Sequence, residues 1–335
     1  MKLASKISLL ALALSASSAF AADLPSRKEA IVPVAPPPMW QGFYAGLNAG
    51  YGFSAGGGAN TTGYEVWNQY ALATMGPRSA TMANTGNEGG LGWATTGFAN
   101  QNQSGFIGGG QIGYNYQYGQ SIVLGIETDI QGTGIRGGGN YFGMGRNNVY
   151  HTYNNGRAPV WHSETTFAGV GNVQSGLDFL GTVRGRIGYL AMPSLLVYGT
   201  GGFTYGGAWA NINTSGTNYY IPWAHLTGAH ADPITNGSYS GNGSGSGLLT
   251  GWNAGGGFEW MFMQNWSAKA EAFYYDLGNM TIQGTGYQAA TLPNTTQANA
   301  MIYNTNTIVR FNGVIARAGV NYHFNWGSAP VVAKF

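Results

Sequence analysis

The sequence contains no cysteine, which excludes disulfide bonds and thiol chemistry. Charged residues are also scarce: they make up 8% of the 335 residues, whereas a soluble domain carries about a quarter. Beyond residue 21, every apolar stretch is broken by Gly, Asn or a charge, so a membrane-spanning helix of about 20 residues is excluded. The surface must therefore face something other than water over much of its area, without crossing a membrane as a helix.

Residues 1–21 have the form of a secretory signal peptide. Lys2 and Lys6 flank the start of a short apolar run, and Ala19 and Ala21 form a small-x-small cleavage site. Residues 22–39 are rich in proline, which predicts an extended periplasmic tether. Removing Lys2 and Lys6 from the 14 basic residues leaves 12, which equals the 12 acidic residues, so no electrostatic nucleic-acid partner is expected.

Eight segments show the period-two alternation of β-strands with one apolar and one polar face. The clearest is 314–324, VIARAGVNYHF, in which Arg317, Asn321 and His323 share one face and apolar residues occupy the other. The eight predicted strands are 40–53, 105–116, 121–131, 177–190, 195–205, 251–262, 266–276 and 314–324. Such a pattern is typical of a sheet with lipid on one side and water or charge on the other.

The connections between these segments alternate in length. Those at 117–120, 191–194 and 263–265 are short, whereas those at 54–104, 132–176, 206–250 and 277–308 are long and rich in Gly, Asn, Thr and Ser. This alternation predicts an all-β fold: an eight-stranded antiparallel up-and-down transmembrane β-barrel with short periplasmic turns and long extracellular loops. The barrel would occupy 40–324, and 325–335 would form a short periplasmic tail.

Aromatic residues gather at both predicted ends of the strands, as expected for the two membrane interfaces. The periplasmic rim is predicted to contain Trp40, Phe43, Tyr114, Tyr116, Tyr189, Trp260, Phe262, Trp266, Tyr322 and Phe324. The opposite rim is predicted to contain Tyr51, Phe53, Phe106, Phe179, Phe203, Tyr205, Trp252 and Tyr274.

Charges within the strands fall on the polar face. Exposing an Arg or Lys to lipid at the midplane would cost roughly 2–4 kcal/mol, so these side chains are expected to point into the lumen and neutralise one another. The predicted lumenal network is Glu127, Asp129, Arg184, Arg186, Glu259, Lys269, Glu271 and Arg317. It would either fill the lumen as a plug or line a selective channel or proton path, with the many inward glycines leaving room for water.

No pattern predicts catalytic, cofactor-binding or metal-binding residues. The match Gly108-x-Gly110-x-x-Gly113 lies inside a predicted strand with no helix after it. His225 and His230 share a loop, but their spacing fits no structural zinc site. An outer-membrane enzyme using loop residues is an alternative, although no Ser/His/Asp or paired-carboxylate constellation stands out. A soluble lipocalin-like barrel would need an apolar lumen and a charged exterior, the reverse of this pattern.

Four stretches resemble a known family: WQGFYAGLNAGYG at 40–52, GFIGGGQIGYNYQ at 105–117, KAEAFYYDLG at 269–278 and RAGVNYHF at 317–324. They are similar to the alphaproteobacterial outer-membrane proteins of the Omp25/Omp31 type. The resemblance implies an eight-stranded outer-membrane barrel, porin-like or active in envelope integrity, without a catalytic residue to carry over. We therefore expect a structural envelope protein, with a passive channel as the main alternative and a surface-loop adhesin as a second.

The expected partners are outer-membrane lipid and the barrel-assembly machinery, and no cofactor is expected. Aromatic residues in the predicted extracellular loops are candidate contacts for host or neighbouring surfaces: Tyr64, Trp67, Tyr70, Tyr219, Tyr220 and Trp223. Either Phe324 or Phe335 would serve as the terminal aromatic signal for assembly.

Overall fold

The computed structural model describes residues 39–66, 89–151, 161–223, 235–291 and 298–324. The predicted signal peptide, the tether up to residue 38 and the tail 325–335 lie outside these ranges, as do Trp67 and Tyr70. The elements are β1 (Gly42–Ser54), β2 (Gly58–Val66), α2 (Gly90–Ala94), β3 (Gly97–Asn100), β4 (Ser104–Tyr118), β5 (Ile122–Thr133), β6 (Arg136–His151), β7 (Trp161–Met192), β8 (Leu195–Trp223), β9 (Thr235–Met263), β10 (Trp266–Thr291) and β11 (Ala298–Phe324).

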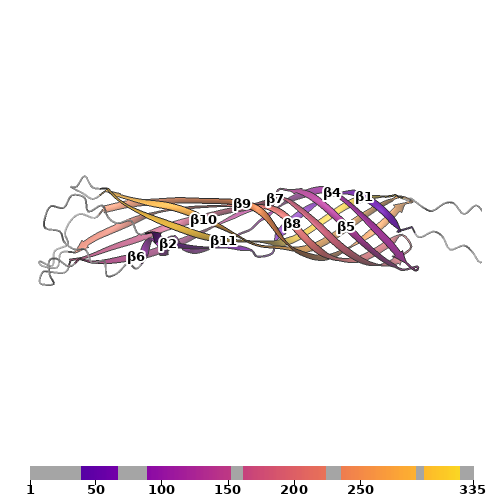
Figure 1. Cartoon of the computed structure of the whole chain (residues 1–335), viewed down its shortest axis with the longest axis horizontal. Coiled ribbons are helices and arrows are strands. Elements are labelled where there is room, and N and C mark those ends of the chain that lie inside the picture. The colour runs from indigo at the N-terminus through magenta and orange to yellow at the C-terminus, as the bar shows by residue number, and fades with distance from the viewer. Residues whose placement is uncertain (1–38, 67–88, 152–160, 224–234, 292–297, 325–335) are drawn as a thin grey trace, which may run out of the picture. The chain divides into compact units, whose positions relative to one another are not determined.

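A ring of antiparallel strands closes on itself. Pairing runs from β1 through β4, β5, β7, β8, β9, β10 and β11, and β11 then pairs with β1. Phe43 on β1, for example, lies opposite both Phe324 on β11 and Tyr114 on β4. Figure 1 shows these strands crossing at a steep tilt around the part labelled β1, β4 and β5. The predicted closed antiparallel barrel is confirmed.

The hairpins at one end of the ring are short. Residues 119–121 join β4 to β5, residues 193–194 join β7 to β8, and residues 264–265 join β9 to β10. The first turn needs Gly119, whose φ of 63° lies in the left-handed region that residues with a Cβ avoid. We call this end of the ring the hairpin end. It also contains the start of β1 and the end of β11.

The connections predicted as long loops consist largely of paired strand. β7 has 32 residues, β8 and β9 have 29 each, β10 has 26 and β11 has 27, whereas about 9–11 suffice to cross a membrane. Their composition is typical of loops. Backbone N–H and C=O groups of antiparallel neighbours nevertheless satisfy one another whatever the side chains, so these segments continue the sheet beyond the ring. We call this continuation the extension (Figure 1).

The interior of the extension is packed with aromatic and aliphatic side chains. One buried cluster joins Leu91 and Ala94 of α2 to Phe167, Tyr239 and Tyr303 from three strands. Tyr141 of β6 lies nearby, where its hydroxyl donates a 2.7 Å hydrogen bond to the Thr95 carbonyl, and burial raises the pKa of Tyr141 to about 12. Within the described ranges, no helix is long and apolar enough to cross a bilayer.

Candidate functional site

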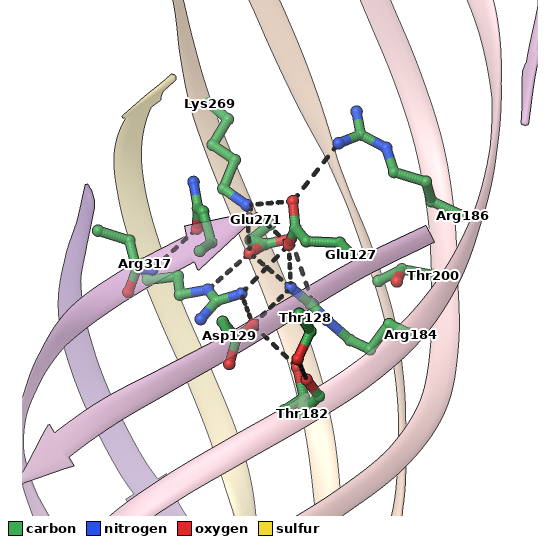
Figure 2. A network of polar contacts seen from close by, with 12 residues as sticks. Glu127, Thr128, Asp129, Thr182, Arg184, Arg186, Thr200, Lys269, Glu271 and Arg317 are labelled. Atoms are coloured by element: carbon green, nitrogen blue, oxygen red, sulfur yellow. Dashed lines mark hydrogen bonds and ion pairs between the residues drawn. The ribbon is translucent and has the colours of Figure 1, made fainter. Parts of the chain in front are cut away.

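The eight predicted lumenal charges are all buried inside the ring. They come from β5, β7, β9, β10 and β11, and Figure 2 shows the group around Arg184 converging on one point. Each is at most 5% exposed. Four are carboxylates and four are basic, so the network is neutral when all are charged. Charges buried in this way are tolerable only when each is paired and hydrogen-bonded.

Ion pairs cross the lumen from one wall to the other. The Lys269 ammonium on β10 donates to both carboxylate oxygens of Glu127 on β5, at 2.9 and 3.0 Å. In the pairing order β1-β4-β5-β7-β8-β9-β10-β11, β5 and β10 stand on opposite sides of the circuit. Side chains from opposite walls therefore meet in the middle of the lumen at this level.

Two arginines bind several carboxylates at once. The Arg184 guanidinium contacts Glu127, Asp129 at 3.1 Å and Glu271 at 3.3 Å. Arg317 donates from Nε to Glu271 at 2.6 Å and from Nη2 to Asp129 at 2.7 Å. Because a guanidinium presents its donors in a planar fork, it can hold carboxylates from different strands in one arrangement. These contacts connect β5, β7, β10 and β11.

A second group of contacts surrounds Glu259, nearer the hairpin end. Arg186 donates to its Oε2 at 2.6 Å, while Asn321 donates to its Oε1 at 2.7 Å. The Ser267 hydroxyl also donates to Oε1, and His323 Nε2 lies 2.9 Å from that hydroxyl. Ser267, Asn321 and His323 were not among the predicted network residues. Their inward position in the alternation of β10 and β11 is the signal that identifies them.

Aromatic rings enclose the charges on both sides. The ring of Phe273 lies 4.9 Å from the Arg184 guanidinium and 5.0 Å from that of Arg317. On the side of the hairpin end, the Tyr198 ring lies 4.2 Å from the Arg186 guanidinium. The Tyr44 hydroxyl donates to Glu127 at 2.8 Å. Cation–π contacts of this kind strengthen when water is excluded.

Apolar layers lie beyond the charges in both directions. At the hairpin end, the buried cluster contains Trp40, Val123, Leu190, Leu196, Tyr198 and Met261. Toward the extension, Phe273 begins a larger cluster that includes Ile107, Leu180, Phe311 and Ile315. The charged network is therefore enclosed between two apolar clusters of the same lumen.

The space beside three inward glycines is filled by neighbouring side chains. A Cβ on Gly50 would lie 2.5 Å from Cβ of Arg317, and one on Gly257 would lie 2.6 Å from Cβ of Glu271. A Cβ on Gly113 would meet the Tyr44 hydroxyl at 2.3 Å. These glycines give their space to neighbouring inward side chains, which is a different role from the water-filled gaps expected from the sequence.

Nine of the ten predicted rim aromatics lie on the outer surface at the hairpin end. Phe43, Tyr116, Tyr189, Trp260, Phe262, Trp266 and Tyr322 are exposed, and Tyr114 and Phe324 are partly exposed. Neighbouring rings on this surface pack against each other, as Phe43 and Tyr114 do with centroids 4.8 Å apart.

Trp40 differs from this prediction: it is 1% exposed and points inward. Its indole N–H donates to the Pro193 carbonyl at 2.9 Å, and its ring meets His323 edge-on. Trp40 precedes β1 but keeps the even numbering of the inward-facing Tyr44 and Asn48, so the alternation extends to Trp40 and places it in the lumen. Gly42, with a φ of 128°, forms the link between Trp40 and the strand.

The metal-binding and cofactor-binding motifs considered from the sequence form no cluster in the part of the chain that the structure describes. There, no group of three or more His, Asp or Glu side chains is placed to hold a metal ion. His225, His230 and Asp232 lie outside the described ranges. The Gly108-x-Gly110-x-x-Gly113 match lies within β4, which leads into the turn at 119–121 and then β5.

Known proteins provide the final comparison. No protein-family model matches the chain. It is 28% identical over 273 residues to the 31 kDa outer-membrane immunogenic protein of Brucella melitensis, which covers 81% of this chain and 85% of the relative, and the Brucella suis protein of the same name matches equally. Among solved structures, OprG from Pseudomonas aeruginosa covers 85% of this chain and 97% of its own, at 9% identity and a TM-score of 0.29. Ail from Yersinia pestis covers 82% of this chain and 99% of its own, at 11% identity and a TM-score of 0.22.

The sequence relationship and the closed antiparallel sheet both agree with the outer-membrane location expected from the strand pattern. The expected resemblance to the alphaproteobacterial outer-membrane proteins of the Omp25/Omp31 type is confirmed by this sequence relationship.

Proposed function

We propose that this protein is a structural component of the outer membrane whose lumen is closed, rather than a channel. The observation that carries the proposal is the pair of contacts between Lys269 and Glu127, which join opposite walls of the ring at 2.9 and 3.0 Å. An eight-stranded barrel has an interior just wide enough for side chains to fill. A network of this kind leaves no ion-sized path at its level.

The layers on either side support the same proposal. A hydrated solute entering at the hairpin end would meet the cluster around Trp40, Leu196 and Met261. From the other direction it would meet the cluster around Phe273 and Ile315. Both clusters consist of apolar side chains that cannot replace the water of an ion. A passive channel would require several layers to move apart together.

The neutral network also supports a role in stabilising the barrel walls. Contacts that join β5, β7, β10 and β11 across the lumen hold the walls together in addition to the ladder hydrogen bonds. Outside the network, the surface between the aromatic rims is apolar and suited to lipid. We infer that the hairpin end faces the periplasm, with residues 22–38 and 325–335 on that side, and that the barrel-assembly machinery inserts the chain.

A deletion strain tests the proposed role in cells. Removing the protein should increase sensitivity to a detergent such as sodium dodecyl sulfate, because a membrane component is lost, and should leave uptake of small hydrophilic solutes unchanged. Expression of the wild-type chain should restore resistance. The measurement is growth in detergent beside the initial rate of solute uptake. A fall in solute uptake with unchanged detergent resistance would contradict the structural role and favour the channel.

A further inference from the structure

The extension of β8, β9, β10 and β11 carries one ion pair at its base, between Arg310 and Asp276, and no charge beyond it. The segments 206–223, 235–250, 277–291 and 298–309 contain no Asp, Glu, Lys, Arg or His. Soluble protein surfaces carry about a quarter charged residues. These four strands are neighbours in the sheet, so the neutral segments lie side by side, although the β9–β10 ladder is interrupted between the pairs Asp276–Trp252 and Gly284–Gly243. This property is independent of the closed lumen.

Most of this surface lies outside the hydrocarbon of the membrane. About 9–11 residues of a tilted strand cross it, whereas β11 has 27 and β10 has 26. On β11 the stretch between the two aromatic rims runs from Val314 to Phe324, so residues 298–312 project beyond it. Figure 1 shows β9, β10 and β11 continuing past the ring. The extension projects from the end opposite the hairpins.

The outward face of these strands is rich in hydroxyl and amide side chains, with Leu248 and Ile308 as exposed aliphatic exceptions. Asn213, Asn242, Thr285 and Asn304 lie in one row across the four strands. The Thr285 hydroxyl donates to the Asn304 side-chain oxygen at 3.0 Å. Rows on either side place Ser240 beside Ser215 and Gln283 beside Asn306. We call this surface the neutral polar face.

The chemistry of the neutral polar face limits the classes of molecule that can bind it. Burying its amides and hydroxyls in acyl chains would remove their hydrogen bonds to water, so hydrocarbon is excluded. Without charge it has no long-range electrostatic attraction for phosphates, polyanions or cations. It does offer many donors and acceptors at strand spacing. Polyhydroxylated, uncharged molecules match this surface.

Two exposed tyrosines lie on the same face. Tyr287 on β10 is 61% exposed and Tyr219 on β8 is 41% exposed. A tyrosine ring offers an apolar surface with a polar tip, which suits the face of a sugar ring with its C–H groups and surrounding hydroxyls. The hairpin of β6 and β7 differs: its exposed outward residues include Phe142, Met144 and Val170.

We propose that the neutral polar face binds the uncharged saccharide units of the glycolipid in the outer leaflet around the barrel. The strands that carry this face also carry the lipid-facing surface, so a glycolipid whose acyl chains lie against the ring has its sugars beside the extension. The proposal rests on the outer-membrane location and on the proposed orientation with the hairpin end in the periplasm, and not on the closed lumen.

Photo-crosslinking in living cells tests the proposal. A photoreactive amino acid at Gln283, on the neutral polar face, should crosslink to glycolipid several-fold more than one at Met144, an exposed control on the β6–β7 hairpin. The product is detected by carbohydrate staining of a band with altered mobility. Heat-modifiable migration on gels shows that each variant has folded. Equal labelling at both positions, no glycolipid product, or a protein product at Gln283 would overturn the proposal.

Two further arms identify the part of the glycolipid that is bound. In a strain whose glycolipid lacks its sugars, the product at Gln283 should disappear; its persistence would show contact with acyl chains and contradict the proposal. The variant Tyr287→Ala should reduce the product at Gln283 several-fold while folding is retained. An unchanged yield in this variant would remove the tyrosine from the site and contradict its role in binding.

Discussion

Replacing Arg184 with methionine should lower the free energy of unfolding by about 3–5 kcal/mol, the usual effect of removing one partner from a buried ion pair. The guanidinium contacts Glu127, Asp129 and Glu271, whose side chains are at most 4% exposed. Methionine keeps much of the side-chain length but leaves these carboxylates with less positive charge. Equilibrium urea unfolding of the refolded protein in detergent micelles measures the difference.

Arg310 provides a matched control. It forms a 2.6 Å ion pair with Asp276, and its own side chain is 51% exposed. Exposed pairs contribute about 0–1 kcal/mol, so Arg310→Met should leave stability nearly unchanged. If both arginine variants lowered the free energy of unfolding by the same small amount, the lumenal charges would not be holding the barrel walls together, and their proposed stabilising role would be wrong.

Substituting alanine for Gly257 should destabilise the barrel by about 1–3 kcal/mol, the typical penalty for overpacking. The new Cβ would lie 2.4 Å from the Ala270 carbonyl oxygen and 2.6 Å from Cβ of Glu271, on the adjacent strand. Because one contact is backbone and the other side chain is fixed by its ion pairs, neither can move freely. The same urea titration detects the loss.

The control for this substitution is Gly199, which lies on the outward face of β8. Its nearest atom to an added Cβ is the Gly255 carbonyl oxygen at 3.9 Å, an ordinary contact. Glycine within a strand is disfavoured against alanine by roughly 0.5–1 kcal/mol, so Gly199→Ala should leave stability unchanged or raise it. Equal destabilisation by both substitutions would mean that lumenal crowding is not the cause.

The closed sheet could be predicted from sequence because lipid and lumen impose opposite demands on successive residues. On β5, Glu127 and Asp129 alternate with Ile126 and Ile130, and the structure buries the acids and exposes the isoleucines. The cost of placing charge in lipid determines this choice without knowledge of any partner. The specific ion pairs are another matter, because they depend on register and on which strands stand opposite.

Trp40 shares the even numbering of the buried Tyr44, so its inward position follows from the alternation. Two other features could not be read from it. The space beside Gly257 is filled by Glu271, and the space beside Gly50 is filled by Arg317. Only the three-dimensional structure shows these contacts. Beyond the membrane, outward-facing residues no longer have to be apolar. The Ser- and Gly-rich start of β9 therefore has loop-like composition although it pairs on both sides.

Planar-bilayer recording of the refolded wild-type protein tests the closed lumen most directly. The contacts from Lys269 to Glu127 across the ring predict no discrete conductance steps over a range of applied voltages, with insertion verified by heat-modifiable migration of the same sample. Reproducible single-channel steps from the inserted wild-type barrel would contradict the account. Arg184→Ala should then change their ion selectivity, since this residue would line an open path.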